Sequence, residues 1–145
     1  MPFDAKLRYP RPLMEKLGVK PGMRVSVVGL DEAWLVKELE DRGAQVTLGR
    51  AGKGSALVFA GMTRPADLAR LAALREAIEP DGAVWVIWPK GRKEFREDDV
   101  RAAGPAARLV DVKVVSVSDT LSGLKLVVPV ALRGAAKHSQ PSRRR

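Results

Sequence analysis

The chain has 145 residues, a net charge of +9 and 46% hydrophobic residues, which is enough for one domain with a substantial core. It contains no cysteine, which excludes disulfides, a thiolate nucleophile and cysteine-based metal sites. No apolar run approaches the roughly 20 residues that span a bilayer, and the amino terminus lacks the pattern of a signal peptide. We therefore expect a cytoplasmic protein without a membrane segment.

Apolar patterns predict helices and strands that alternate along the chain. Short β-branched runs predict strands, whereas apolar residues at every third or fourth position predict helices. Residues 44–48 alternate, as an edge strand does, and residues 83–88 are all apolar, as in a central parallel strand. The expected elements are a helix at 12–17, a strand at 24–29, a helix between Asp31 and Gly43, strands at 44–48 and 55–61, a helix from Thr63 or Asp67 to Ile78, a strand at 83–88, a helix at 97–103, and strands at 109–117 and 124–132.

Turn residues set the connections between these elements. Pro80-Asp81-Gly82 predicts a tight turn, and Pro89 ends the strand that follows it. The loop at 118–123 is too short for a parallel crossover, so the last two strands are expected to be antiparallel. Pro129 falls inside the last one, which therefore needs an exposed edge or a bulge. These patterns predict an α/β fold, a three-layer Rossmann-like, mostly parallel sheet of about six strands that ends in an antiparallel hairpin.

The positive charge is concentrated at the carboxyl terminus. Residues 133–145 hold five Lys or Arg and no acidic residue, which leaves 21 basic against 17 acidic residues, or +4, for residues 1–132. We expect a single domain at 1–132 and a basic, disordered tail at 133–145. The only histidine, His138, lies in that tail. No Ser-His-Asp triad or His-based metal site can therefore be assembled, and no catalytic residue or metal is predicted.

Three stretches carry a resemblance to known proteins. They are Lys16-Leu-Gly-Val-Lys-Pro-Gly-Met-Arg-Val25, Trp85-Val-Ile-Trp-Pro-Lys90, and Leu109-Val-Asp-Val-Lys-Val114 with Asp119 and Ser122-Gly-Leu-Lys125. They resemble a bacterial family of short Rossmann-like proteins of unknown function, over roughly residues 6–132. The order of elements is also similar to the class I S-adenosylmethionine-dependent methyltransferase fold, and residues 78–82 look like the Leu-x-Pro-Gly-Gly turn common there.

The resemblance implies a methyl-donor site at the loop after the first strand. The candidate cofactor-binding residues are Gly29, Asp31 and Glu32 in that loop and Gly61 at the end of the strand 55–61. Methyltransferases of this class usually have a Gly-x-Gly-x-Gly loop there, and an acidic residue at the end of the second strand. This loop has one glycine, and the second strand runs into Leu48-Gly-Arg50. Arginine cannot accept hydrogen bonds from ribose hydroxyls, although it could contact a phosphate. Asp31 is explained equally well as the N-cap of the following helix.

Four further residues are candidates for binding a ligand or anion. Lys90 follows the carboxyl end of the strand at 83–88, the edge where α/β sheets usually bind ligands; it could equally be a solvated lysine. Asp119, Ser122 and Lys125 surround the final hairpin and could close over a ligand, or could serve as ordinary turn residues.

Three hypotheses for function follow. The leading one is a small non-catalytic binding or interaction module on a degenerate methyltransferase-like scaffold, with no firmly implied cofactor. The alternative is an atypical S-adenosylmethionine-dependent methyltransferase. The third is a weak, salt-dependent binder of nucleic acid or another polyanion through the tail. A protein partner or a homodimer is expected if the terminal hairpin exposes apolar surface.

Overall fold

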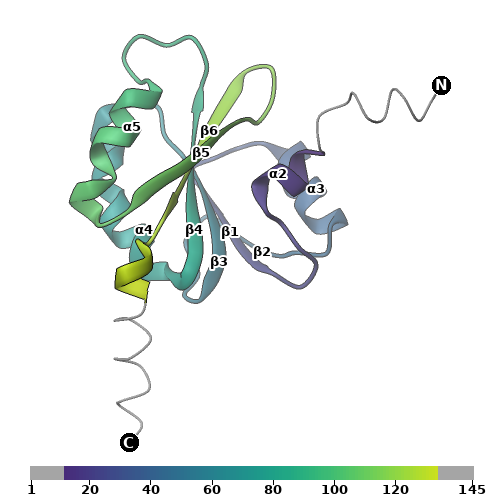
Figure 1. Ribbon diagram of the computed structural model, residues 1–145. Coiled ribbons are helices and arrows are strands. Elements are labelled where there is room, and N and C mark those ends of the chain that lie inside the picture. The colour runs from purple at the N-terminus through teal and green to yellow at the C-terminus, as the bar shows by residue number, and fades with distance from the viewer. Residues whose placement is uncertain (1–11, 134–145) are drawn as a thin grey trace, which may run out of the picture.

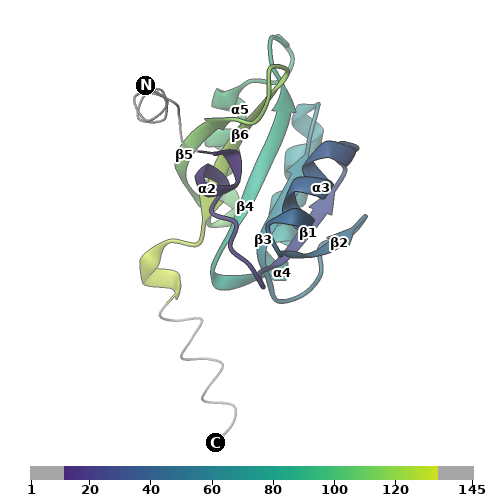
Figure 2. The same cartoon turned by 90° about the vertical axis from the view of Figure 1, so that its right-hand side faces the viewer.

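The computed structural model describes residues 12–133, and they form one six-stranded sheet. The order across the sheet is β2-β1-β3-β4-β6-β5. The first four strands are parallel, β6 is antiparallel to β4, and β5 is antiparallel to β6 (Figure 2). The predicted mixed sheet and its antiparallel end are thus confirmed, as is the edge position of β2. The strands are β1 (Arg24–Val28), β2 (Gln45–Leu48), β3 (Ser55–Gly61), β4 (Ile78–Pro89), β5 (Val110–Ser116) and β6 (Leu121–Val127).

Helices cover both faces of the sheet. Helices α2 and α3 lie on one side of the sheet, and α4 and α5 lie on the other (Figure 1). Two separate apolar clusters fill the space between helices and sheet. The described helices are α2 (Leu13–Leu17), α3 (Ala33–Asp41), α4 (Leu71–Ala77) and α5 (Glu97–Ala103), with 3-10 turns η1 (Pro65–Arg70) and η2 (Pro105–Ala107).

Strand β4 is the centre of the core, because its apolar side chains are buried on both faces. Trp85 lies in the cluster under α2 and α3, whereas Trp88 lies in the cluster under α4 and α5. Trp85 stacks on Phe59 with 6.5 Å between ring centroids, and its indole N–H donates to the carbonyl of Leu17. The period-2 geometry of a strand explains this, because it places residues three apart on opposite faces.

The tight turn predicted at Pro80-Asp81-Gly82 is wrong, because these residues belong to β4. The strand starts at Ile78, directly after α4, and its register with β3 jumps between the pairs Ser55–Ile78 and Leu57–Ala83. Residues 79–82 thus form an irregularity within the strand. A Cβ on Gly82 would lie 2.7 Å from the carbonyl oxygen of Ala56, so glycine is needed for close backbone approach.

The last strand is shifted from its predicted bounds. It begins at Leu121, three residues early, because the Ser118 hydroxyl and the carbonyl of Leu121 close a short turn. It ends at Val127, and a helical turn that starts after Pro129 replaces its predicted end. Arg133 belongs to that turn and donates from Nε to the carbonyl of Val128 at 2.7 Å, so it is not part of a disordered tail. Residues 134–145, which include His138, lie outside the described residues.

Among residues 12–133, no helix combines the length and the apolar character that crossing a bilayer requires.

Candidate functional site

The topological switch point of the sheet lies between β1 and β3. After β1 the chain continues to β2 on one side, and it then returns to β3 on the other side. Ligands of α/β proteins usually bind outside the carboxyl ends of strands at such a point. Here the backbones of Gly29 and Gly61 meet, because a Cβ on Gly61 would lie only 2.3 Å from the Gly29 carbonyl oxygen. The two strand ends therefore contact each other directly, which explains glycine at position 61.

A pocket of about 600 Å³ opens beside this contact, between the ends of β1 and β2 and helix α3. Gly29, Asp31 and Glu32 line it, together with the apolar side chains of Leu30 and Leu48. Glu40 and Lys37 complete the rim, and Lys37 is paired with Asp41 at 2.9 Å. We call it the acidic pocket. Three of the four predicted cofactor residues line this pocket, whereas Gly61 contacts Gly29 but does not line it.

The carboxylates of this pocket have different surroundings. Helix α3 starts at Ala33, its N-cap position is Glu32, and no side chain caps it. The N-cap role predicted for Asp31 is therefore wrong, since the helix begins one residue too late for it. Glu32 accepts a hydrogen bond from the indole N–H of Trp34 at 2.7 Å, and Asp31 is exposed. Both can accept hydrogen bonds from hydroxyl groups or face a cation.

Arg50, which replaces the usual acidic residue, does not line the acidic pocket. It borders a separate hollow with Gln45 and Lys53. The connector there is anchored by the buried Ser26 and Ser55, whose hydroxyls lie 2.8 Å apart, and the Ser26 hydroxyl accepts from the N–H of Gly52. Sequence analysis missed this serine pair, because single serines in apolar strands carry no distinctive pattern.

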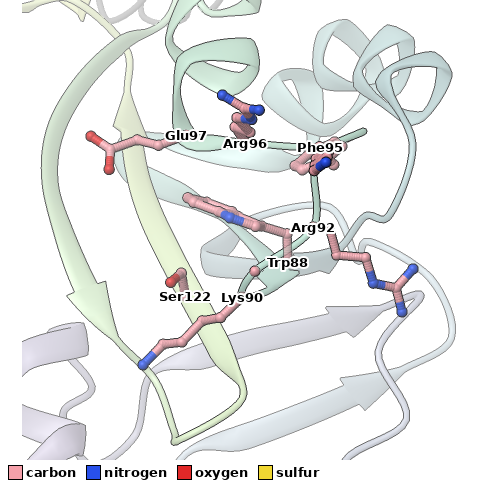
Figure 3. A pocket seen from close by; sticks show the side chains of 9 residues that line it. Trp88, Lys90, Arg92, Phe95, Arg96, Glu97 and Ser122 are labelled. Atoms are coloured by element: carbon pink, nitrogen blue, oxygen red, sulfur yellow. The ribbon is translucent and has the colours of Figure 1, made fainter.

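A second pocket, of about 410 Å³, lies farther along the same edge, where β4 ends next to β6. Trp88, Lys90 and Ser122 line it, with residues of the loop between β4 and α5 (Figure 3). Lys90 donates from its backbone N–H to Thr120 at 2.8 Å, and from Nζ to the Ser116 hydroxyl at 2.6 Å. We call it the basic pocket. The cations that sequence analysis missed here are Arg92, Lys93 and Arg96.

The structure separates the other predicted ligand residues. Asp119 is exposed in the turn before β6, outside the residues that line the basic pocket. On β6, Lys125 pairs with Trp85 of β4, whereas Ser122 pairs with Trp88, three positions farther along β4. It lines a different hollow with Gly18 and Arg133. Burial lowers the pKa of Lys125, and the positive charges of Lys113 and Arg133 lower it further.

Comparison with known proteins gives the fold but no family. No family model matches the chain, and no curated protein sequence matches it. Among solved structures, it is similar to a putative methyltransferase from Thermoplasma acidophilum, with 9% identity and a TM-score of 0.63 over 84% of this chain and 76% of that one. It is also similar to a SAM dependent methyltransferase from Aquifex aeolicus, with 16% identity and a TM-score of 0.61 over 80% of this chain and 88% of that one.

A third similar structure contains a ligand. It is magnesium protoporphyrin IX methyltransferase from Synechocystis PCC 6803 with bound S-adenosylmethionine, which is 15% identical with a TM-score of 0.62 over 80% of this chain and 74% of that one. The chain has a methyltransferase-like Rossmann fold. At these identities the likeness shows the fold alone, so the chemistry must be argued from the pockets.

The side chains that line the acidic pocket fit an adenosyl ligand. Such a ligand combines hydroxyl donors, an apolar ring and, in S-adenosylmethionine, a sulfonium cation. Asp31 and Glu32 supply acceptors and negative charge, whereas Leu30 and Leu48 supply apolar wall. Within residues 12–133, no group of three or more His, Cys, Asp or Glu is arranged to hold a metal ion.

Proposed function

We propose that the chain binds S-adenosylmethionine in the acidic pocket and acts as an atypical S-adenosylmethionine-dependent methyltransferase. The observation that carries this proposal is the pocket itself: about 600 Å³ beside the switch point, lined by Asp31, Glu32 and apolar side chains. A solved structure with a similar fold and bound S-adenosylmethionine supports it. Membership of the bacterial family of unknown function stays a prediction.

In this proposal the residues of the chain bind and orient. When bound, S-adenosylmethionine supplies a methyl group activated by the sulfonium. The Asp31 carboxylate accepts hydrogen bonds from hydroxyl groups, and its charge, with that of Glu32, favours a cationic ligand. The Leu48 side chain is 58% exposed. An apolar ring that covers it removes this surface from water, which favours binding. No described side chain is needed as a nucleophile, so catalysis would come from positioning the two reactants.

The test is calorimetric titration of the full chain with S-adenosylmethionine and S-adenosylhomocysteine. We expect micromolar binding that weakens at least about tenfold in Asp31→Leu, which removes the charge and adds bulk, because one hydrogen bond to a charged group is worth about 1.5–3 kcal/mol. Asp119→Leu is the matched control, since it changes another exposed loop aspartate. Absence of heat and of any melting shift at several temperatures would refute the proposal, as would equal weakening in both variants.

A second candidate function, a non-catalytic interaction module, is favoured by a different observation. The backbones of Gly29 and Gly61 approach each other closely at the switch point, and no carboxylate follows β2 in the connection to β3. Such a module needs an interaction surface, and the edge strand β5 exposes Val110, Val112 and Val114 to 44%, 53% and 40%. An uncovered apolar edge strand is a typical pairing surface.

We therefore propose β5 as the surface for a homodimer or another protein partner under this second function. Light scattering that compares the wild-type chain with the Val112→Lys variant tests for the homodimer. The positive charge of the introduced lysine should dissociate it. Turnover of a methyl donor would exclude a purely non-catalytic role. A monomer at all concentrations would leave only a foreign partner for β5.

A further inference from the structure

The basic pocket forms a distinct unit, built on β4 and β6 away from the acidic pocket. In Figure 3 the Trp88 indole lies at its centre, with Lys90 and Ser122 on one side and Phe95 and Arg96 on the other. Arg92 extends to the side of the ring. The volume of about 410 Å³ lies within the range of small-molecule sites.

The charge that lines this pocket is strongly one-sided. The residues that line it include four cations, Lys90, Arg92, Lys93 and Arg96, and one carboxylate, Glu97. None of these four cations has an ion pair within 4 Å among the described residues. Four cations in one small concavity repel one another and create a positive potential that attracts an anion.

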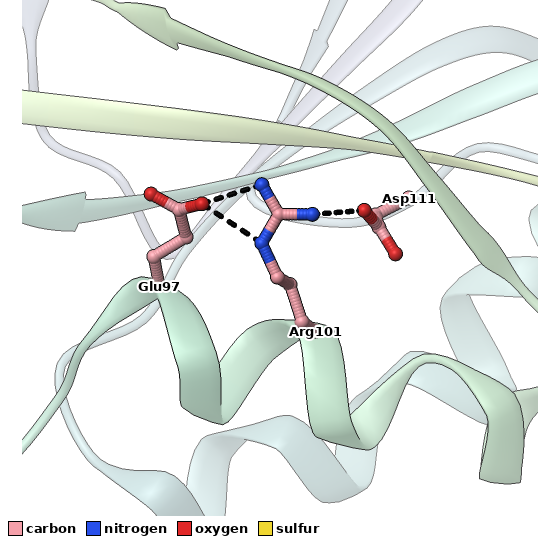
Figure 4. Close-up of polar contacts among 3 residues, drawn as sticks. All are labelled: Glu97, Arg101 and Asp111. Atoms are coloured by element: carbon pink, nitrogen blue, oxygen red, sulfur yellow. Dashed lines mark hydrogen bonds and ion pairs between the residues drawn. The ribbon is translucent and has the colours of Figure 1, made fainter.

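Two carboxylates in the first turn of α5 form hydrogen bonds with other groups. Glu97 accepts from Nε of Arg101 at 2.8 Å, and Arg101 also pairs with Asp111 on β5 (Figure 4). Asp99 accepts from the backbone N–H of Arg96 at 2.8 Å and so caps the start of α5. Glu94 is exposed and does not line the pocket. None of these carboxylates forms an ion pair within 4 Å with a cation of the basic pocket.

The loop that carries the cations is fixed at both ends. Phe95 is 1% exposed and packs against Trp88 with 6.0 Å between ring centroids. At the other end, Lys90 is held through its backbone by Thr120 and through Nζ by Ser116. Anchoring of this kind lowers the entropy that is lost when a ligand binds.

We propose that the loop 90–96, together with Trp88 and Ser122, forms a binding site for a phosphate-bearing ligand. Phosphate carries up to two negative charges and three acceptor oxygens, and guanidinium groups bind it through paired hydrogen bonds. Because the cations lie on several sides of the indole, they suit a ligand whose negative charge is spread over several oxygens, such as a phosphate, better than a ligand with one carboxylate. The proposal is independent of S-adenosylmethionine binding, because the two pockets share no lining residue.

The experiment titrates the full chain with inorganic pyrophosphate, followed by calorimetry and tryptophan emission. We expect saturable binding, and an emission change that disappears in Trp88→Phe. The double variant Arg92→Gln/Arg96→Gln should bind about tenfold more weakly or worse, since each lost hydrogen bond to a charged group contributes measurably. The matched control is Arg50→Gln/Lys53→Gln, which removes the same charge from exposed positions elsewhere and should change affinity less than about threefold.

Three results would overturn the proposal. They are absence of binding by the wild-type chain at about 10 mM pyrophosphate, equal weakening in both double variants, and an emission change that persists in Trp88→Phe. Melting temperatures of the two double variants should match the wild type, because all four side chains that they replace are exposed.

A second arm identifies the source of the phosphate. Oligothymidylate of about ten nucleotides is titrated against the same variants. Competition with pyrophosphate and dependence on Arg92 and Arg96 assign the site to a nucleic-acid backbone. Pyrophosphate binding without competition assigns it to a small phosphorylated molecule. Oligonucleotide binding that depends only on Arg143–Arg145, with no pyrophosphate binding, contradicts the proposal and supports the tail as the polyanion site.

Discussion

The acidic and basic pockets lie along the same edge of one sheet, yet they carry opposite charge. The acidic pocket uses a short connection, Gly29–Glu32, that leads directly from β1 into α3. The basic pocket uses a longer loop, 90–96, that is anchored by Phe95 before α5 begins. The comparison teaches that strand topology fixes where ligands can bind, while the loops that follow each strand decide what can bind.

The largest expected effect comes from removing the centre of the basic pocket. Trp88→Ala deletes a 5% exposed indole and should lower the free energy of unfolding by about 3–5 kcal/mol, because it leaves a cavity in the core. Urea denaturation measures the loss, and Trp34→Ala, at a partly buried position, should cost less. At a temperature where the variant is folded, pyrophosphate binding should be lost and S-adenosylmethionine binding kept. Loss of both would show that the pockets are coupled.

The second-largest effect is expected from a substitution that disturbs the acidic pocket and not the basic pocket. Gly61→Ala places a Cβ 2.3 Å from the Gly29 carbonyl oxygen, and should destabilise the chain by about 1–3 kcal/mol through overpacking. Gly52→Ala is the matched control, because its Cβ would meet no atom nearer than 3.5 Å. The displaced Gly29 loop should weaken S-adenosylmethionine binding and leave the basic pocket unchanged. Equal melting temperatures for the two variants would argue against the glycine contact.

The smallest effect concerns the segment that follows β3, which lines neither pocket. Residues 62–70 run from β3, where the Met62 N–H donates to Ile87 of β4 at 2.9 Å, into η1. The Asp67 carboxylate accepts from the N–H groups of Thr63 and Arg64. These hydrogen bonds, of which the one from Thr63 has the larger effect, lower the pKa of the Asp67 carboxyl below the ordinary 3.8. Asp67→Ala should cost about 1 kcal/mol near neutral pH, as loss of a cap does.

The pH dependence of that loss has a definite sign. Since the folded pKa of Asp67 is depressed, its contribution is present above pH 3.8 and fades as the pH falls through the folded pKa. The difference in unfolding free energy between wild type and Asp67→Ala should therefore shrink below about pH 4. Denaturation curves between about pH 3 and pH 7 measure it, and a constant difference would exclude the ionised carboxylate as the cause.

Much of the fold followed from local patterns. The continuous apolar run at 83–88 predicted the central strand, alternation at 44–48 predicted the edge, and the short last loop predicted the antiparallel end. Each depends on residues near in sequence. One error arose where distant backbone decided the outcome: Gly82 packs on the backbone of Ala56, so the predicted turn became part of β4.

The candidate sites were predictable to a lesser degree. The position after β1 could be predicted, because a Rossmann-like order directs attention there, and so could Lys90 at the end of β4. The role of Gly61 could not, since it depends on the contact with Gly29 across the switch point. Arg92, Lys93 and Arg96 were missed, because a charged loop has no periodic pattern and forms a pocket only when Phe95 anchors it.

The sequence by itself determined which segments are buried and how they alternate, because hydrophobic periodicity is a local property of the chain. Only the tertiary structure decided that β6 lies between β4 and β5, which places Ser122 beside Trp88 and Lys125 away from it. Strand order depends on contacts between residues far apart in sequence. The chemistry of each pocket, which those contacts assemble, therefore becomes visible only in the folded chain.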